Sequence, residues 1–286
     1  MTMAPVALFI FNRPEPTRRV FERIRAARPE RLLVVADGPR ADRPAEADAC
    51  RAARDIAASV DWPCDVRTNY SDANLGCKRR VASGLDWVFQ LCESAIILED
   101  DCVPEPTLFR FFDEMLARYR DDARVMMVSG TNPLGEWKRD RHDYHFSYCG
   151  SIWNWASWRR AWRSYDVDMK LWADEDVRQR VRDVFAEPEL YEGRVAAYDA
   201  VARGKVDTWD MQWSFARIIQ SGLSVVPAVN LVRNVGFGPG ATHTHKANAP
   251  AADLPTTPMT FPLREPRCVA VDREYDRQFT RKLSGK

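Results

Sequence analysis

Short apolar runs and helical segments alternate along the first hundred residues of the chain. A continuous apolar run between turn residues predicts a buried strand. Such runs occupy residues 6–11, 32–36 and 95–98, and we expect a further short strand over 64–68. Helical spacing or alanine-rich composition predicts helices from Pro14 onwards, over 45–59 and over 77–91. Repeated strand–helix units are typical of an α/β protein whose mainly parallel sheet carries helices on both faces.

The second half of the chain has a less regular pattern. We expect helices over 108–119 and 211–219, a strand over 125–128 and a last strand over 227–232. Eight of the ten tryptophans lie between Trp137 and Trp213, which marks a change of composition. A glycine-rich loop with histidines covers residues 234–245. The tail from Lys246 is rich in alanine, proline and charge, and we expect it to wrap the surface loosely.

Composition excludes several classes of protein. The net charge of +1 over 286 residues provides no global field for nucleic acid or membrane. The seven cysteines form no Cys-x-x-Cys pair, which argues against a disulfide framework or a zinc cage. No apolar run approaches the roughly 20 residues that span a bilayer, and no signal segment is visible. We therefore expect a cytoplasmic protein.

Three consecutive carboxylates, Glu99-Asp100-Asp101, follow the fourth predicted strand. Ligands bind at the carboxyl ends of parallel strands, where the loops that begin at Asn12, Asp37, Asn69 and Glu99 should converge. Adjacent carboxylates repel one another unless a cation neutralises them, and Mg²⁺ or Mn²⁺ prefers oxygen ligands. The alternative is an acidic cap on a helix that begins near Pro104 and Pro106. The position at a strand end favours the metal.

Polar residues in the neighbouring loops are candidates for binding a nucleotide. Asn12 and Arg13 can hold a base or a phosphate, and Asp37 can accept a hydrogen bond from a base, although Asp37-Gly38-Pro39 is equally a turn signal. Lys78 lies at a predicted helix start, where anions are favoured. The alternative for Lys78 is a solvent-facing basic turn.

Two further segments carry candidate chemistry. Trp153 and Trp155 flank Asn154, and we expect one of the two rings to pack inward while the other stacks on a sugar ring. Asp207 is the expected amino-terminal cap of the helix that follows it. Asp210 then lies in the first turn, where its carboxylate can act as a general base.

The glycine-rich loop carries His243 and His245, which flank Thr244. A loop of this kind can close over a ligand, and His243 can add a ligand to a metal. A surface loop without such a role is the alternative.

Taken together, these motifs resemble a known family. Phe11-Asn12-Arg13-Pro14, the Asp37-Gly38 turn, Asn74-Leu75-Gly76 and Ile97-Leu98-Glu99-Asp100-Asp101 are similar to segments of GT-A-fold glycosyltransferases, above all N-acetylglucosaminyltransferase I and its bacterial relatives. The resemblance implies a Rossmann-like GT-A fold with a mostly parallel central sheet. It also implies a single domain over residues 1–245, with a nucleotide-sugar-binding half (1–105) and an acceptor-binding half (106–245), followed by a tail (246–286).

The same resemblance implies roles for individual residues. Asp101 would ligate Mn²⁺ or Mg²⁺, Glu99 and Asp100 would contact the ribose and the donor sugar, and Arg13 and Asp37 would hold the nucleotide. The family's catalytic base lies in a Trp-Asp segment before a helix, which matches Trp209-Asp210. Its later phenylalanine–glycine loop is similar to the segment from Phe237 to His243.

The predicted activity is a metal-dependent, inverting transfer of a sugar from a UDP-, GDP- or dTDP-sugar to an acceptor hydroxyl. The resemblance suggests a saccharide or lipid-linked acceptor in bacterial surface polysaccharide or glycolipid synthesis, and a lipid-linked acceptor would require contact with a membrane surface. One alternative is a sugar-phosphate nucleotidyltransferase, although residues 12–16 lack the glycine-rich loop that this reaction usually needs. Another is a carbohydrate-binding protein without catalysis.

Overall fold

The first half of the chain folds into the alternating strands and helices that its apolar pattern predicts. The computed structural model describes residues 3–237 and 254–283. Its first elements are β1 (Val6–Ile10), α1 (Pro14–Ala27), β2 (Arg31–Ala36), α2 (Glu46–Ala58), β3 (Asp65–Tyr70), α3 (Gly76–Leu91) and β4 (Ser94–Glu99). All four predicted strands and all three predicted helices of this half are confirmed.

The second half contains more elements than its pattern indicated. They are β5 (Cys102–Pro104), α4 (Thr107–Arg118), β6 (Val125–Ser129), β7 (Tyr144–Ser147), β8 (Trp155–Trp158), α5 (Arg159–Trp162), the 3₁₀ helix η1 (Lys170–Ala173), α6 (Glu175–Phe185), α7 (Pro188–Ala202), α8 (Asp210–Ile218), β9 (Leu223–Pro227), β10 (Val232–Asn234) and α9 (Arg273–Leu283). The expected α4, β6 and α8 are confirmed. The strand predicted over 227–232 is wrong, because the chain there leaves β9 and joins β10 in a different sheet.

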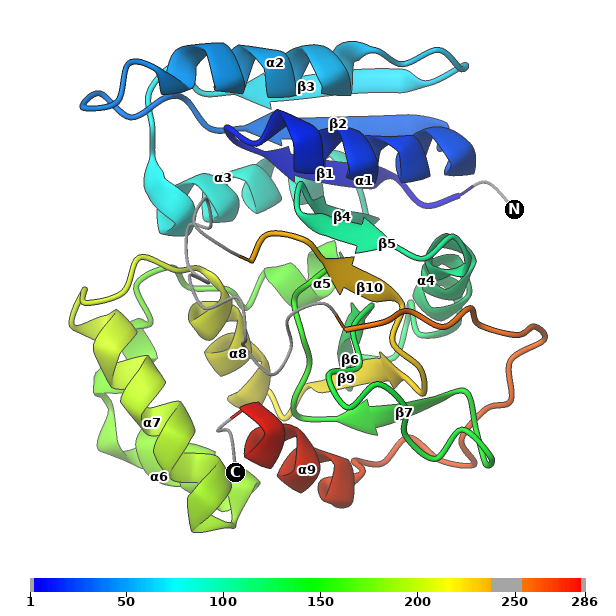
Figure 1. Cartoon of the computed structure of the whole chain (residues 1–286). Coiled ribbons are helices and arrows are strands. Elements are labelled where there is room, and N and C mark those ends of the chain that lie inside the picture. The colour runs from blue at the N-terminus through cyan, green and yellow to red at the C-terminus, as the bar shows by residue number, and fades with distance from the viewer. Residues whose placement is uncertain (1–2, 238–253, 284–286) are drawn as a thin grey trace.

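A large central sheet organises the molecule, with strand order β3-β2-β1-β4-β8-β6-β9-β7 (Figure 1). The first four strands in this order are parallel, and so are β6 and β9. The strands β8 and β7 run antiparallel to their neighbours. The mostly parallel α/β sheet that the sequence predicts, with a Rossmann-like arrangement of strands and helices, is therefore confirmed.

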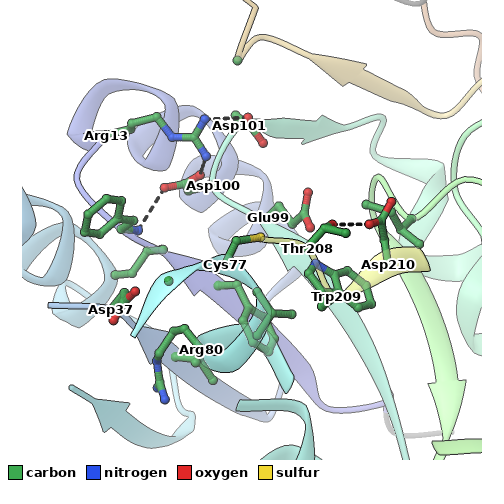
Figure 2. A pocket seen from close by; sticks show the side chains of 18 of the residues that line it. Arg13, Asp37, Cys77, Arg80, Glu99, Asp100, Asp101, Thr208, Trp209 and Asp210 are labelled. Atoms are coloured by element: carbon green, nitrogen blue, oxygen red, sulfur yellow. Dashed lines mark hydrogen bonds and ion pairs between the residues drawn. The ribbon is translucent and has the colours of Figure 1, made fainter. Parts of the chain in front are cut away.

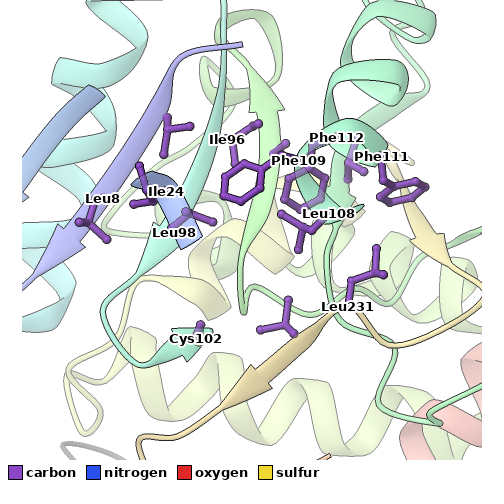
Figure 3. Packing of buried hydrophobic residues seen from close by; sticks show 14 of the residues in the cluster. Leu8, Ile24, Ile96, Leu98, Cys102, Leu108, Phe109, Phe111, Phe112 and Leu231 are labelled. Carbon is purple, nitrogen blue, oxygen red and sulfur yellow. The ribbon is translucent and has the colours of Figure 1, made fainter. Parts of the chain in front are cut away.

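Helices cover both faces of this sheet because successive strand residues point to opposite sides. Leu8, Val34 and Leu98 face one core, which α1, α2 and α4 complete. Figure 3 shows part of this core, where the leucine and phenylalanine side chains of α4 pack beside β4. Phe9 and Val35 face the other core, which α3, α5 and α8 complete.

The described part of the tail is an integral element of the structure. Tyr275 and Phe279 on α9 are buried against Cys149 and Val226, and α9 lies beside β7 (Figure 1). The expectation of a loosely wrapped tail is wrong for residues 273–283, because one face of α9 is apolar and is buried. Among the described helices, none combines the length and the apolar composition needed to cross a membrane.

Candidate active site

A cavity opens at the carboxyl ends of the parallel strands. The strand register aligns Ile10 with Ala36, and Phe9 with Glu99, so the loops after β1, β2 and β4 meet at one edge. The cavity encloses about 460 Å³, a size typical of sites for small ligands. Its lining includes Phe11, Arg13, Asp37, Arg40, Asn74, Gly76, Cys77, Arg80, Glu99, Asp100, Asp101, Ile152, Trp153, Asp207, Thr208, Trp209, Asp210, Asn234 and Gly236.

Asp100, the middle residue of the acidic triplet, accepts hydrogen bonds from other residues of the protein. Arg13 Nη2 donates to Asp100 Oδ1, and the backbone N–H of Phe11 donates to Asp100 Oδ2 at 3.1 Å. Asp100 is 2% exposed, and burial raises its pKa to about 6, while Arg13 acts in the opposite direction. The carboxylate that we expected to contact the donor therefore points to Arg13 (Figure 2).

Glu99 and Asp101 lie on either side of the Cys102 thiol. Cys102 Sγ is 3.4 Å from Asp101 Oδ1 and 3.8 Å from Glu99 Oε2. Burial raises the pKa of Glu99 well above its ordinary value, and the charge of Asp101 adds to this shift. Arg13 Nη1 donates to Asp101 Oδ2 at 2.7 Å and is the cation paired with this carboxylate among the described residues. The carboxyl groups at the end of β4 therefore outnumber Arg13, the described cation that pairs with them.

The residues at this point fit a divalent cation. Ligand atoms of Glu99, Asp101 and Cys102 lie within 4.8 Å of one another. Burial raises the pKa of the Cys102 thiol well above its ordinary value, and a neutral thiol is a poor ligand for Mg²⁺ or Mn²⁺. The two carboxylates are suitable oxygen ligands for such a cation. Glu99, assigned to the donor by resemblance, is therefore a second candidate metal ligand beside Asp101.

The alternative of an acidic helix cap does not agree with the structure. The strand β5 separates the triplet from α4, which begins at Thr107. Glu105, rather than the triplet, accepts a hydrogen bond from the Thr107 N–H at 2.7 Å.

The backbone of the triplet is held by residues that the sequence did not reveal as important. Asn154 Nδ2 donates to the Cys102 carbonyl at 2.8 Å, and Asn154 Oδ1 accepts from the Glu99 N–H at 3.3 Å. Asn154 has a φ of 47°, a backbone conformation that asparagine tolerates better than most residues. The sequence signal that could have drawn attention to Asn154 was its position, as a polar residue, between two tryptophans.

The segment after β10 closes against Asp101. The Val235 N–H donates to the Asp101 carbonyl at 2.8 Å. A Cβ atom at Gly236 would lie only 1.9 Å from Asp101 Oδ2, so a side chain at this position would displace the carboxylate. Pairing of Asn234 with Cys102 between β10 and β5 brings these residues together, and this antiparallel contact is remote in sequence.

Asp37 forms a closed hydrogen-bond network at the opposite end of the cavity. Its Oδ1 accepts from the N–H groups of Gly38 and Leu75, both at 2.9 Å, and its Oδ2 accepts from Asn74 Nδ2 at 3.0 Å. Burial raises the pKa of Asp37. The carboxylate thus fixes residues 74 and 75 beside the cavity and has little remaining capacity to accept from a nucleotide base.

Arg80 is a buried cation in the wall of the cavity, and it was not among the residues predicted to bind a nucleotide. Its Nη2 donates to Asn69 Oδ1 at 2.8 Å and to the Asn69 carbonyl, and its buried Nε has no hydrogen-bond partner in the described structure. Burial lowers the pKa of Arg80. Helical spacing with Cys77, Gly84 and Val88 was the signal that Arg80 faces inward.

Two predicted nucleotide contacts, Asn12 and Lys78, do not line the cavity. Lys78 Nζ lies 3.9 Å from a carboxylate oxygen of Asp168. The start of α3 is occupied by Asp207, which accepts from the N–H groups of Cys77 at 2.9 Å and of Lys78 at 3.2 Å. Asp207 therefore caps α3 and not α8. The prediction that it caps the helix that follows it is wrong, because its capping partners, Cys77 and Lys78, are distant in sequence.

The remaining side of the cavity is formed at the start of α8. Asp210 is the first residue of this helix, and its Oδ1 accepts from Thr208 Oγ1 (Figure 2). Asp210 also raises the pKa of the Cys77 thiol and of Glu99, although burial is the larger cause in both cases. The candidate base therefore shares a cavity with the candidate metal ligands.

The three selected tryptophans have different environments. Trp153 is half-buried and lines the cavity. Trp155 is fully buried, faces the core and does not line the cavity, so it cannot stack on a sugar. Trp209 is 3% exposed and stacks on Trp155 with ring centroids 5.5 Å apart. Trp153 and Trp209 thus both line the cavity, and Trp153 has the more exposed ring of the two. The predicted metal ligand His243 lies outside the described residues.

Comparison with known proteins assigns no family to this chain. No family model matches it, and no curated protein matches it. A solved structure similar to it is a UDP-glucose pyrophosphorylase complexed with UDP-glucose, at 8% identity and a TM-score of 0.39, covering 80% of this chain and 92% of that one. Another is 4-diphosphocytidyl-2C-methyl-D-erythritol synthase from Anaerococcus prevotii DSM 20548, at 14% identity and a TM-score of 0.30, covering 60% and 78%.

Both of these enzymes are nucleotidyltransferases, the class named in the alternative prediction and not in the main one. Likenesses at such TM-scores do not decide the function of this chain. The resemblance to N-acetylglucosaminyltransferase I is not shown by any of the comparisons.

Proposed function

We propose that this protein transfers a sugar from a nucleoside-diphosphate sugar to an acceptor hydroxyl with the help of Mn²⁺ or Mg²⁺. The observation that carries the proposal is the joint presence of Glu99, Asp101 and Asp210 in one cavity of about 460 Å³. Two of these carboxylates are candidate metal ligands, and the third is a candidate base. This combination suits attack by a hydroxyl on a substrate that carries a diphosphate.

The donor would lie between the Asp37 network and the end of β4. Phe11 and Arg80 would line the nucleotide end of this path, and Arg13 lies beside Asp100 and Asp101 at the end of β4 (Figure 2). A cation on Glu99 and Asp101 would neutralise the charge that develops on the leaving diphosphate. Trp153 would contact a sugar ring on the acceptor side.

Asp210 would remove the proton from the acceptor hydroxyl. The hydroxyl oxygen then forms a bond to the anomeric carbon while the bond from this carbon to the phosphate oxygen breaks. The electron pair leaves with the nucleoside diphosphate, and the proton stays on Asp210. Attack from the side opposite to the leaving group inverts the anomeric configuration, as in inverting glycoside hydrolysis.

Nucleotidyl transfer is the second candidate, because candidate metal ligands in a cavity of this size also suit a reaction on a nucleoside triphosphate. The residues after β1 argue against it. The Phe11 N–H and the Arg13 guanidinium both donate to Asp100, and no glycine lies between residues 11 and 16. This loop therefore lacks the open backbone N–H groups with which a glycine-rich loop holds phosphates. A carbohydrate-binding protein without catalysis would not need a base such as Asp210 beside the candidate metal ligands.

A screen of substrates separates these candidates. UDP-, GDP- and dTDP-sugars are incubated with Mn²⁺, with Mg²⁺ or with a chelator, and release of nucleoside diphosphate is measured. Nucleoside triphosphates with sugar 1-phosphates are tested in parallel for release of pyrophosphate. We expect metal-dependent release from a nucleotide sugar only. Pyrophosphate release alone would establish the nucleotidyltransferase, and saccharide binding without either reaction would establish the binding protein.

The role of Asp210 is tested by Asp210→Asn, with Asp207→Asn as the matched control. A general base typically contributes about 10²–10⁴-fold, so Asp210→Asn should reduce turnover by at least about 100-fold. Metal-dependent binding of the nucleotide should remain. Asp207→Asn should retain activity, because asparagine also caps helices well. Near wild-type turnover in Asp210→Asn would refute the assignment.

A further inference from the structure

A second cavity adjoins the first on the side of Asp210. It encloses about 360 Å³ and shares Ile152, Trp153 and Asp210 with the first cavity. Its remaining walls come largely from α7, α8 and α9, and α7 packs against both of the other helices (Figure 1). The candidate base therefore faces two spaces, one on the metal side and one among these helices.

Two arginines line the second cavity. Arg194 on α7 is half-buried, and its guanidinium donates to Ser214 Oγ at 3.2 Å and lies 3.7 Å from Cys149 Sγ. Arg217 on α8 is 2% exposed and donates to Ser224 Oγ at 2.6 Å. Its buried Nε has no partner in the described structure. The partners in these contacts are all uncharged groups. The contacts leave guanidinium N–H groups able to donate further hydrogen bonds.

The charge of these arginines is not balanced by a direct ion pair. Within residues 3–237 and 254–283, the ion pairs found at 4.0 Å or less involve neither Arg194 nor Arg217. Asp276 is the carboxylate that acts on both by charge. It is already paired with Arg273 at 3.2 Å and accepts from Ser147. Burying charge without a partner is costly, so an anion in this cavity would be stabilised.

We propose that the second cavity is the acceptor pocket and that the acceptor carries an anionic group, a carboxylate or a phosphate, bound by Arg194. This inference rests on the proposed sugar transfer. Arginine binds both anions through two parallel N–H groups. Binding there would place a hydroxyl of the acceptor at Asp210, at the junction of the two cavities. Leu190 and Phe279 add apolar wall to the same cavity, which suits the hydrophobic face of a sugar ring.

The first test measures binding without relying on catalysis. D-glucuronate, inorganic phosphate and D-glucose are titrated into the wild-type protein, Arg194→Gln and Arg203→Gln by calorimetry. Arg203 follows α7, pairs with Asp199 and does not line the cavity, so it is the matched control. We expect an anion to bind the wild type and Arg203→Gln, and to bind Arg194→Gln at least about tenfold more weakly. D-glucose should not distinguish the variants.

The two anions separate the possible acceptor types. Preference for glucuronate over phosphate indicates an acidic sugar, and the reverse indicates a phosphate-bearing acceptor. If Arg194→Gln does not fold, Arg194→Lys keeps the charge but loses the planar pair of donors, and weaker anion binding by Arg194→Lys is then expected. Anion binding that is unchanged in the variant, or no tighter than glucose binding in the wild type, would overturn the inference.

A second measurement distinguishes failure of this inference from failure of the proposed function. Binding of UDP, GDP or dTDP with Mn²⁺ is measured on the same samples. Nucleotide binding without anion binding leaves the proposed function standing and removes the acceptor inference. Anion binding at Arg194 without nucleotide binding or transfer removes the proposed function and its acceptor pocket together. With an active donor, Arg194→Gln should raise KM for an anionic acceptor at least about tenfold and leave KM for a neutral one unchanged.

Discussion

The carboxylates of the first cavity fall into two groups that differ in their hydrogen bonds. Asp37 and Asp100 each accept several hydrogen bonds from the protein. Among the described residues, the Glu99 carboxylate has a 3.8 Å contact from a thiol, and Asp210 accepts from the hydroxyl of Thr208. Glu99 and Asp100 are adjacent in the sequence and yet belong to different groups, so closeness in sequence does not imply a shared role. The first group shapes the cavity, whereas the second retains capacity to bind a cation or a proton.

The largest contrast should come from adjacent residues. Glu99→Gln should weaken Mn²⁺-dependent nucleotide binding by at least about tenfold, because it removes a metal ligand, while the free energy of unfolding stays within about 0.5 kcal/mol of wild type. Asp100→Asn should lower the free energy of unfolding by about 2–3 kcal/mol, because Arg13 loses a charged partner. Calorimetry and urea denaturation measure the two quantities. Equal effects of both substitutions on both quantities would refute the division into two groups.

A smaller effect is expected at the nucleotide end. Asp37→Asn replaces one accepting oxygen by an amide group and should lower the free energy of unfolding by about 1–3 kcal/mol. Asp72→Asn is the control, since Asp72 is exposed near the same loop, and its effect should stay within about 0.5 kcal/mol. Urea denaturation of both variants provides the measurement. If Asp37→Asn is as stable as Asp72→Asn, the Asp37 network does not hold the loop.

The smallest effects should separate two tryptophans. Trp153→Phe should raise KM for the acceptor by about 3–10-fold with little change in stability, because a smaller ring remains at the cavity wall. Trp155→Phe should leave KM unchanged and lower the free energy of unfolding by about 1–2 kcal/mol, because it lies in the core. Steady-state kinetics and thermal unfolding are compared for both. A KM change confined to Trp155→Phe would contradict the placement of the two rings.

The sequence predicted the first half of the fold well because three of its four strands, β1, β2 and β4, are continuous apolar runs. Burial on both faces leaves little choice of residues in β1, β2 and β4. The strands β7 and β8 were missed because they are short and pair antiparallel with remote segments. Such pairings depend on tertiary structure, which local patterns do not report.

The candidate site was also predicted only in part, because some of its contacts depend on tertiary structure. The sequence identified the acidic triplet and the Trp209-Asp210 segment, which lie in one cavity. It did not show which carboxylate Arg13 would occupy, or which helix Asp207 would cap. These outcomes depend on side-chain directions across loops. The spacing of Tyr275 and Phe279, four residues apart, was a local signal for α9 that composition of the tail obscured.

The position of β8 has a consequence for dividing the protein. Although β5, α4, β6 and β7 separate the two strands in the sequence, β8 pairs with β4 on one side, and it pairs with β6 on the other. A fragment that ends at residue 105 would expose the backbone edge of β4 and the apolar faces beside it. Such edges promote aggregation. Expression of the first half alone, or its exchange between proteins as a module, is therefore expected to fail unless residues 155–158 are supplied with it.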